Sequence, residues 1–113
     1  MSTEISCNEV ASGTILVALS GKLMLGSGGE RIVSLVEELL RQGKRTFIFD
    51  LSGVAVIDST GIGHFISSFN KIMAVGGDMR MAGATGHVLE SFRVSLLDTV
   101  FPFFPSVDAA RAA

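Results

Sequence analysis

Three polar side chains that could do chemistry stand together where an apolar run ends. The stretch AVIDSTGIG at residues 55–63 places Asp58, Ser59 and Thr60 between aliphatic residues and two glycines. A hydroxyl beside a carboxylate could act as a nucleophile, bind a phosphate, cap a helix or accept a modification. The spacing of the neighbouring residues decides between these roles.

The spacing argues against the common catalytic sites. A nucleophile elbow requires G-x-S-x-G, but Ile57 stands two residues before Ser59. An aspartic-protease loop needs glycine where Thr60 stands, and the chain holds no second copy. The glycine segments lack the remaining residues of dinucleotide and phosphate loops. The two available bases, His64 and His87, have no orienting partner visible in the sequence, so we predict that the protein is not an enzyme.

A helix cap explains only part of this cluster. Asp, Ser and Thr are all preferred at a helix N-cap, where each is worth about 1 kcal/mol over Ala. One cap does not require three such residues, nor the glycines that follow them. Glycine inside a helix costs about 1 kcal/mol relative to Ala. We therefore expect Gly61 and Gly63 to let another molecule approach the backbone.

A hydroxyl at a helix start is also well placed to carry a phosphate, because free N–H groups and the helix dipole favour anions there. The dipole stabilises a phosphate by about 0.3–1 kcal/mol. An unpaired charge buried at an interface costs much more, about 2–5 kcal/mol. A phosphoserine of charge about −1.5 to −2 beside Asp58 is therefore expected to change binding rather than folding.

Composition restricts the possible partners. The 113 residues suffice for one domain, residues 1–113, and the net charge of −2 comes with no basic block, which argues against direct nucleic-acid binding. No apolar segment approaches the ~20 residues that cross a bilayer, so we expect no membrane association. Cys7 is the single cysteine, which excludes an internal disulfide and a thiolate metal cluster. The start MSTEISCNEV lacks the features of a secretory signal, and we expect a cytoplasmic protein without metal or cofactor.

Alternating strands and helices are predicted to position the cluster. The strands are expected near residues 5–8, 14–21, 45–51, 78–83 and 99–101, and the helices near 30–41, 60–75, after Thr85, and 106–112. The order predicts an α/β fold, with a small mixed β-sheet of four to five strands packed with about four helices. Cys7 is expected in the core and His87 on the surface.

The helix expected at residues 60–75 has two contrasting faces. Its predicted buried stripe is Ile62, Phe65, Ile66, Phe69, Ile72 and Met73. The other face collects Thr60, His64, Ser67 and Lys71. Composition alone favours a plain solvated face, but its continuity with Ser59 favours a partner-docking surface. The residues predicted to contact a partner are therefore Asp58, Ser59, Thr60, Gly61, Gly63, His64, Ser67 and Lys71.

Four segments together resemble a STAS domain, and within that superfamily a stand-alone bacterial anti-sigma factor antagonist. They are SGKL at 20–23, FDLSGVAVIDSTGIG at 49–63, GGDMRMAG at 76–83 and SLLDTVFPFFPSVDAA at 95–110. The resemblance runs from about Ile5 to the C-terminus, and its most specific part is the second segment. The sequence departs from many members by having Met24 where they carry Asp, and by the glycine-rich segment that follows.

The resemblance implies a regulator that binds an anti-sigma factor with serine kinase activity and so releases a sigma factor. It also implies that this kinase phosphorylates Ser59 and that a serine phosphatase reverses the modification. Two alternatives stay open: a scaffold or ligand-sensing module in a larger signalling assembly, and a weak nucleotide binder. A nucleotide would find only Lys22 and Arg31 near the glycine-rich segment.

Overall fold

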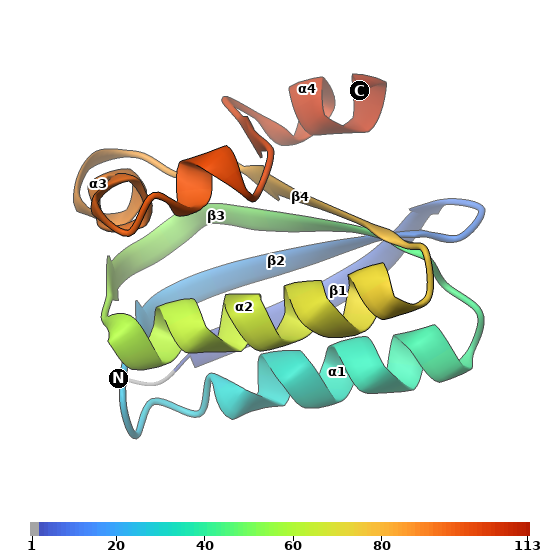
Figure 1. Ribbon diagram of the computed structural model, residues 1–113, viewed down its shortest axis with the longest axis horizontal. Coiled ribbons are helices and arrows are strands. Elements are labelled where there is room, and N and C mark those ends of the chain that lie inside the picture. Colours follow the sequence, from blue (N-terminus) through green and yellow to red (C-terminus); the bar gives the residue numbers. More distant parts are fainter. Residues whose placement is uncertain (1–2) are drawn as a thin grey trace.

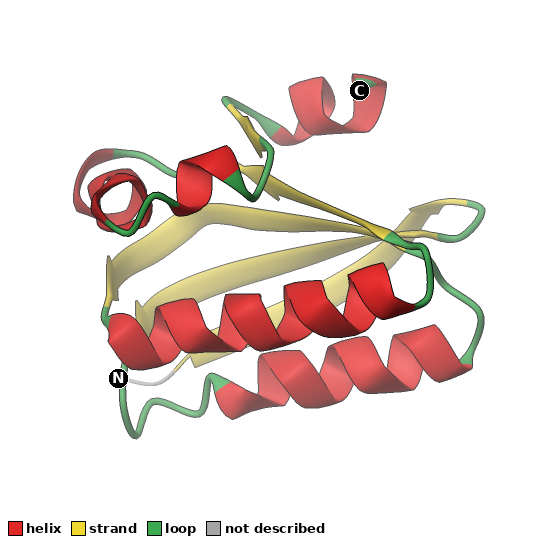
Figure 2. Ribbon diagram, in the orientation of Figure 1, coloured by secondary structure: helices red, strands yellow, loops and turns green. Residues whose placement is uncertain are grey.

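A five-stranded mixed sheet forms the centre of the molecule, and helices lie on both of its sides (Figures 1 and 2). The computed structural model describes residues 3–113. The strands are β1 (Thr3–Ala11), β2 (Thr14–Leu23), β3 (Thr46–Ile57), β4 (Asp78–Ala82) and β5 (Phe103–Phe104). The helices are α1 (Glu30–Arg41), α2 (Ser59–Ala74), α3 (Gly86–Val94), the 3-10 helix η1 (Leu97–Thr99) and α4 (Val107–Ala112). The predicted α/β fold with a small mixed sheet is confirmed.

The strands lie in the order β1-β2-β3-β4-β5, and only the β1–β2 pair is antiparallel. The central strand β3 extends beyond the predicted residues 45–51 and ends at Ile57. Its last residues are therefore the apolar run that precedes Asp58. Because α2 begins at Ser59, the polar cluster occupies the junction between the central strand and the helix that follows it.

The main hydrophobic core lies between the sheet and helices α1, α2 and α3. Side chains alternate between the two faces of a strand, so Phe47 and Phe49 point into this core while Ile48 points away from it. The rings of Phe65 in α2 and Phe92 in α3 meet with centroids 5.8 Å apart. On the opposite face, α4 covers a smaller cluster that contains Ile48 (Figure 1).

Two sequence predictions about the sheet are wrong. The segment expected as a strand at 99–101 is not one, and the short edge strand is instead β5. Phe101 is needed in the core, where its ring packs against those of Phe69 and Phe92, so pairing with β4 starts only at Pro102, whose carbonyl accepts the Met81 N–H at 2.9 Å. Cys7, expected in the core, is exposed because β1 is the outermost strand of the sheet.

The buried face of α2 also differs from the predicted stripe. Ile66 and Met73 are 40% and 48% exposed. The fully buried positions are Gly61, Phe65, Ser68 and Ile72. Ser68 is tolerated there because its hydroxyl donates to the His64 carbonyl oxygen at 2.8 Å. The helix is thus rotated relative to the prediction, and a serine and a glycine occupy the positions closest to its neighbours.

Position 61 requires glycine because another part of the same chain packs against its backbone. A Cβ atom at this position would clash with the backbone carbonyl oxygen of Leu23 at the end of β2 and lie 2.9 Å from Ile57 Cγ1. The expectation that Gly61 admits another molecule is therefore wrong, because β2 already occupies that space. A Cβ atom at Gly63 would meet nothing within 4 Å, so this position does face open space.

The two glycines make a matched pair for a stability test. We expect Gly61→Ala to destabilise the fold by at least about 2 kcal/mol, because a backbone atom has to move to admit the methyl group. Gly63→Ala, two residues further along the same helix, should leave stability unchanged or raise it by up to about 1 kcal/mol through helix propensity. Denaturant unfolding of both variants measures the difference. Equal effects of the two substitutions would contradict the internal role of Gly61.

Candidate functional site

The Asp58 carboxylate joins the start of α2 to the loop after β2. Its Oδ1 accepts the backbone N–H of Gly61 at 3.0 Å, which makes Asp58 the N-cap of α2. Its Oδ2 accepts the backbone N–H of Leu25, also at 3.0 Å. These bonds from Leu25 and then Gly61 lower the pKa of the Asp58 carboxyl below its ordinary value. Of the three polar residues in the cluster, Asp58 is the one that caps.

Ser59 is the first residue of α2 and is exposed. The side-chain oxygen that caps α2 belongs to Asp58, so the Ser59 hydroxyl is not needed to cap the helix. Thr60 is half-buried beside it. Two adjacent residues at the helix start therefore have different roles. The Asp58 carboxylate accepts backbone hydrogen bonds, and the Ser59 side chain is exposed.

Ser59 also lines an open groove of about 400 Å³ between α2 and α3. The groove is bordered by Ile57, Asp58, Ser59, Ile62, His87, Glu90, Ser91, Val94 and Ser95. Aliphatic side chains from β3, α2 and α3 line part of it, and Asp58, Glu90 and His87 are its ionisable groups. A phosphate on Ser59 would thus adjoin a groove with two carboxylates and one imidazole.

His87, considered above as a possible base and expected on the surface, lines the same groove as Ser59. It is exposed, as predicted, and its Nε2 accepts the backbone N–H of Ile57 at 3.4 Å. Ile57 and His87 are 30 residues apart in the chain. No local pattern in the sequence indicates this proximity, because it arises from the packing of α3 against the end of β3.

The remaining residues predicted to contact a partner lie on the side of α2 that faces α1. His64 packs close to Gly29 at the start of α1, where an added Cβ would lie 3.0 Å from His64 Cδ2. Lys71 forms an ion pair with Glu37 of α1 at 3.1 Å. Ser67 is exposed between them. The stripe from Thr60 to Lys71 therefore follows the α1–α2 boundary, whereas the Ser59 groove lies between α2 and α3.

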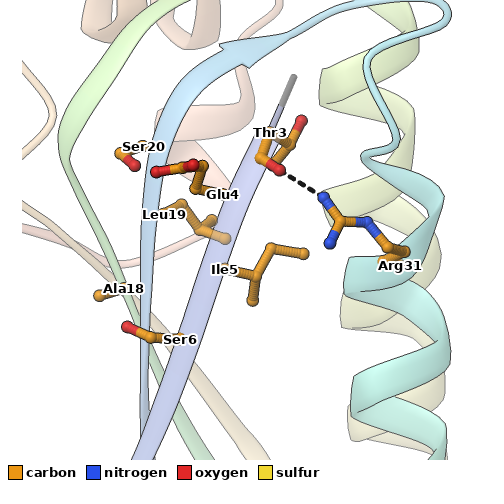
Figure 3. A pocket seen from close by; sticks show the side chains of 8 residues that line it. All are labelled: Thr3, Glu4, Ile5, Ser6, Ala18, Leu19, Ser20 and Arg31. Atoms are coloured by element: carbon orange, nitrogen blue, oxygen red, sulfur yellow. Dashed lines mark hydrogen bonds between the residues drawn. The ribbon is translucent and has the colours of Figure 1, made fainter. Parts of the chain in front are cut away.

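A second hollow, of about 510 Å³, lies elsewhere on the surface (Figure 3). It is lined by β1, β2 and the first turn of α1, and Figure 3 shows Arg31 donating a hydrogen bond to the Thr3 carbonyl oxygen. Ser59 does not border it. Among residues 3–113, no three His, Cys, Asp or Glu side chains are grouped so that they could hold a metal ion. Within the same range, no helix combines the length and apolar character needed to span a membrane.

Comparison with known families gives one match over most of the chain. The model of the STAS domain family matches residues 8–110, and this range contains both the Asp58–Ser59 junction and the α3 groove. Comparison with curated proteins gives no sequence match.

Solved structures with the same fold include three bacterial proteins. A putative anti-sigma factor antagonist from Thermotoga maritima superimposes with a TM-score of 0.86 at 16% identity, over 96% of this chain and 92% of that one. An anti-sigma factor antagonist from Mycobacterium paratuberculosis gives 0.85 at 18% identity, over 98% and 92%. The Bacillus cell fate determinant SpoIIAA in its phosphorylated form gives 0.76 at 20% identity, over 96% and 98%. At these identities the likeness establishes the fold.

The two hydrogen bonds of the Asp58 carboxylate predict a pH-dependent stability. Because its pKa is lower in the folded state, ionised Asp58 stabilises the fold above the unfolded-state pKa of about 3.9. This contribution is lost as the pH falls through the lowered folded-state pKa. We expect Asp58→Ala to lose about 1 kcal/mol at neutral pH from the helix cap alone.

Asp58→Asn tests the charge separately, because the amide oxygen can still accept the Gly61 N–H. The stability difference between wild type and Asp58→Asn should be largest at neutral pH and shrink in acid. Urea unfolding between neutral pH and pH 3 measures it, with Asp98→Asn at an exposed carboxylate as the control. A difference that stays constant across this range would show that the Asp58 charge does not stabilise the fold.

Proposed function

The chain belongs to the STAS domain family, and on this premise we propose that it is an anti-sigma factor antagonist switched by phosphorylation of Ser59. In its unphosphorylated form it binds an anti-sigma factor that has serine kinase activity and thereby releases a sigma factor. The kinase phosphorylates Ser59, and a serine phosphatase restores the hydroxyl. The protein is a cytoplasmic, non-enzymatic regulator that acts by protein–protein interaction.

The observation that carries this proposal is the division of tasks between Asp58 and Ser59. Asp58 accepts two backbone N–H groups and fixes the helix start, whereas the adjacent Ser59 hydroxyl is exposed and free of capping duty. A kinase can therefore reach Ser59 without unfolding the helix. The three similar folds from bacterial regulators, one of them a phosphorylated form, support the same function.

The surroundings of Ser59 favour a change in binding over a change in fold. Asp58 and Glu90 already make the groove beside Ser59 acidic, and neither lysine nor arginine is among the described residues that line it. A phosphate would add about −1.5 to −2 charge at this position. A partner surface that fits the neutral hydroxyl would then bury an unfavourable charge, while the backbone bonds of Asp58 continue to hold the helix start.

The partner surface is proposed to centre on Ser59, Thr60 and Gly63. Ser59 is exposed, and Gly63 offers open space one turn further along α2. The predicted extension through His64, Ser67 and Lys71 follows the α1–α2 boundary, and Ser67 is its most exposed member. Nucleotide binding is less favoured, because the Arg31 guanidinium already donates to the carbonyl oxygens of Thr3 and Gly28.

The modified residue can be identified directly. We expect incubation with the kinase partner and ATP to place one phosphate on Ser59, because its hydroxyl is exposed and lies outside the cap. Mass spectrometry of the digested protein locates the phosphate, with Ser59→Ala as the unmodifiable control. Phosphate found mainly on Thr60, Ser52 or Ser67, or retained in Ser59→Ala, would contradict the assignment.

The switch can be separated from unfolding with phosphate-mimicking variants. Ser59→Asp should melt close to wild type, since the site is exposed, but bind the partner on the order of a hundredfold more weakly. Ser59→Ala should bind the partner constitutively, because it has no hydroxyl to modify.

Ser34→Asp, at an exposed serine of α1, is the matched control and should keep wild-type affinity. Calorimetric binding and thermal unfolding measure both properties. If Ser59→Asp binds as wild type does, or fails only because it has melted, the proposed switch is wrong.

A further inference from the structure

We propose that His87 forms an intramolecular site for the phosphate on Ser59, across the groove between α2 and α3. The inference rests on the proposed modification of Ser59 and adds a residue from a different helix to that site. Its ligand is a phosphate monoester dianion held within the same chain. The grounds are the shared groove, the charge of its lining and the hydrogen bond that His87 makes in the unmodified protein.

The groove beside Ser59 contains two carboxylates, and His87 is the residue of its lining that can bind an anion. A dianion on Ser59 would adjoin the carboxylate of Asp58 from the start of α2 and that of Glu90 from α3. Of the described residues that line the groove, His87 alone can become positively charged. Glu90 lies 4.0 Å from Arg93, a residue outside the groove lining, which offsets part of the Glu90 charge. The imidazole is therefore the cation that the phosphate can attract.

His87 cannot keep its present hydrogen bond and carry a positive charge at the same time. Its Nε2 accepts the Ile57 N–H, and a ring nitrogen can accept only while it carries no proton. A protonated His87 has two N–H donors and has to give up this bond. The bond is long at 3.4 Å, and the side chain is exposed, so the ring can leave Ile57 with little loss. A phosphate acceptor in the same groove favours the protonated, released ring.

The exchange has a direct consequence for both partners. An opposite charge nearby favours the charged form of a titrating group, so phosphorylation should raise the pKa of His87 by about 1. By reciprocity, protonated His87 should lower the second pKa of the phosphoserine. The Ile57 amide loses its acceptor at the same time. The contact therefore requires a protonated His87 ring and an ionised phosphate at the same time.

A test that needs no kinase installs phosphoserine at position 59 during translation. NMR titration of the two histidine rings, with and without the phosphate, should show a pKa increase of about 1 for His87 and a much smaller change for His64, which packs against α1. Phosphorus NMR should show a higher second phosphoserine pKa in His87→Gln than in wild type. The Ile57 amide should exchange faster with solvent in the phosphorylated protein.

Equal pKa changes for the two histidines would overturn the proposal, because they would indicate a general field rather than a contact. An unchanged phosphoserine pKa in His87→Gln would overturn it as well. Should His87→Gln fail to fold, the comparison of His87 with His64 in the wild-type chain still decides. Because the phosphate is introduced without a kinase, these outcomes do not depend on partner binding, and failure of the Ser59 switch would appear only in the binding measurements.

Discussion

The Asp58 carboxylate is the interaction on which the arrangement around Ser59 depends. One oxygen holds the first turn of α2, and the other holds the loop after β2, 33 residues earlier in the chain. The backbone N–H of Asp58 donates to the Leu23 carbonyl oxygen, which is also the atom that leaves no room for a side chain at Gly61. The end of β2, the end of β3 and the start of α2 are therefore fixed to one another at one point.

This arrangement would allow the proposed modification of Ser59 to be accessible and to leave the fold largely unchanged. The residue that holds the backbone is half-buried, while the neighbouring hydroxyl lies outside the hydrogen bonds that define the helix start. Under the proposed switch, a charge added to Ser59 would meet an intact cap, and its main effect would be on a partner that contacts this surface. Under the proposed switch, this separation would leave the fold the same in both states.

Helix α3 forms one wall of the groove beside Ser59. Phe92 packs against Phe65 and Phe101 in the core, and this packing brings the first turn of α3 beside the end of β3. His87 and Glu90 thus border the groove that Ser59 lines. The chemistry available to a modified Ser59 consequently depends on aromatic packing between helices that are remote from it in the sequence.

The features that could be predicted from the amino-acid sequence are those that arise from local interactions. Alternating apolar patterns and turn residues specify the order of strands and helices, and the Asp58–Thr60 cluster marks the start of α2 because capping involves neighbours within one turn. The exposed position of Ser59 at the start of α2 agrees with the same local signals. The most specific part of the family resemblance, the segment at 49–63, is likewise one continuous stretch.

The features that could not be predicted depend on the tertiary structure, because they involve residues far apart in the chain. It assigned Gly61 to internal packing against Leu23, exposed Ile66 and Met73, moved the edge strand beyond Pro102 and placed His87 beside the end of β3. A helical period gives the spacing of apolar residues but not the angle at which neighbouring elements meet the helix. That angle is set by the joint packing of α1, α3 and the sheet, and no segment of the sequence contains it alone.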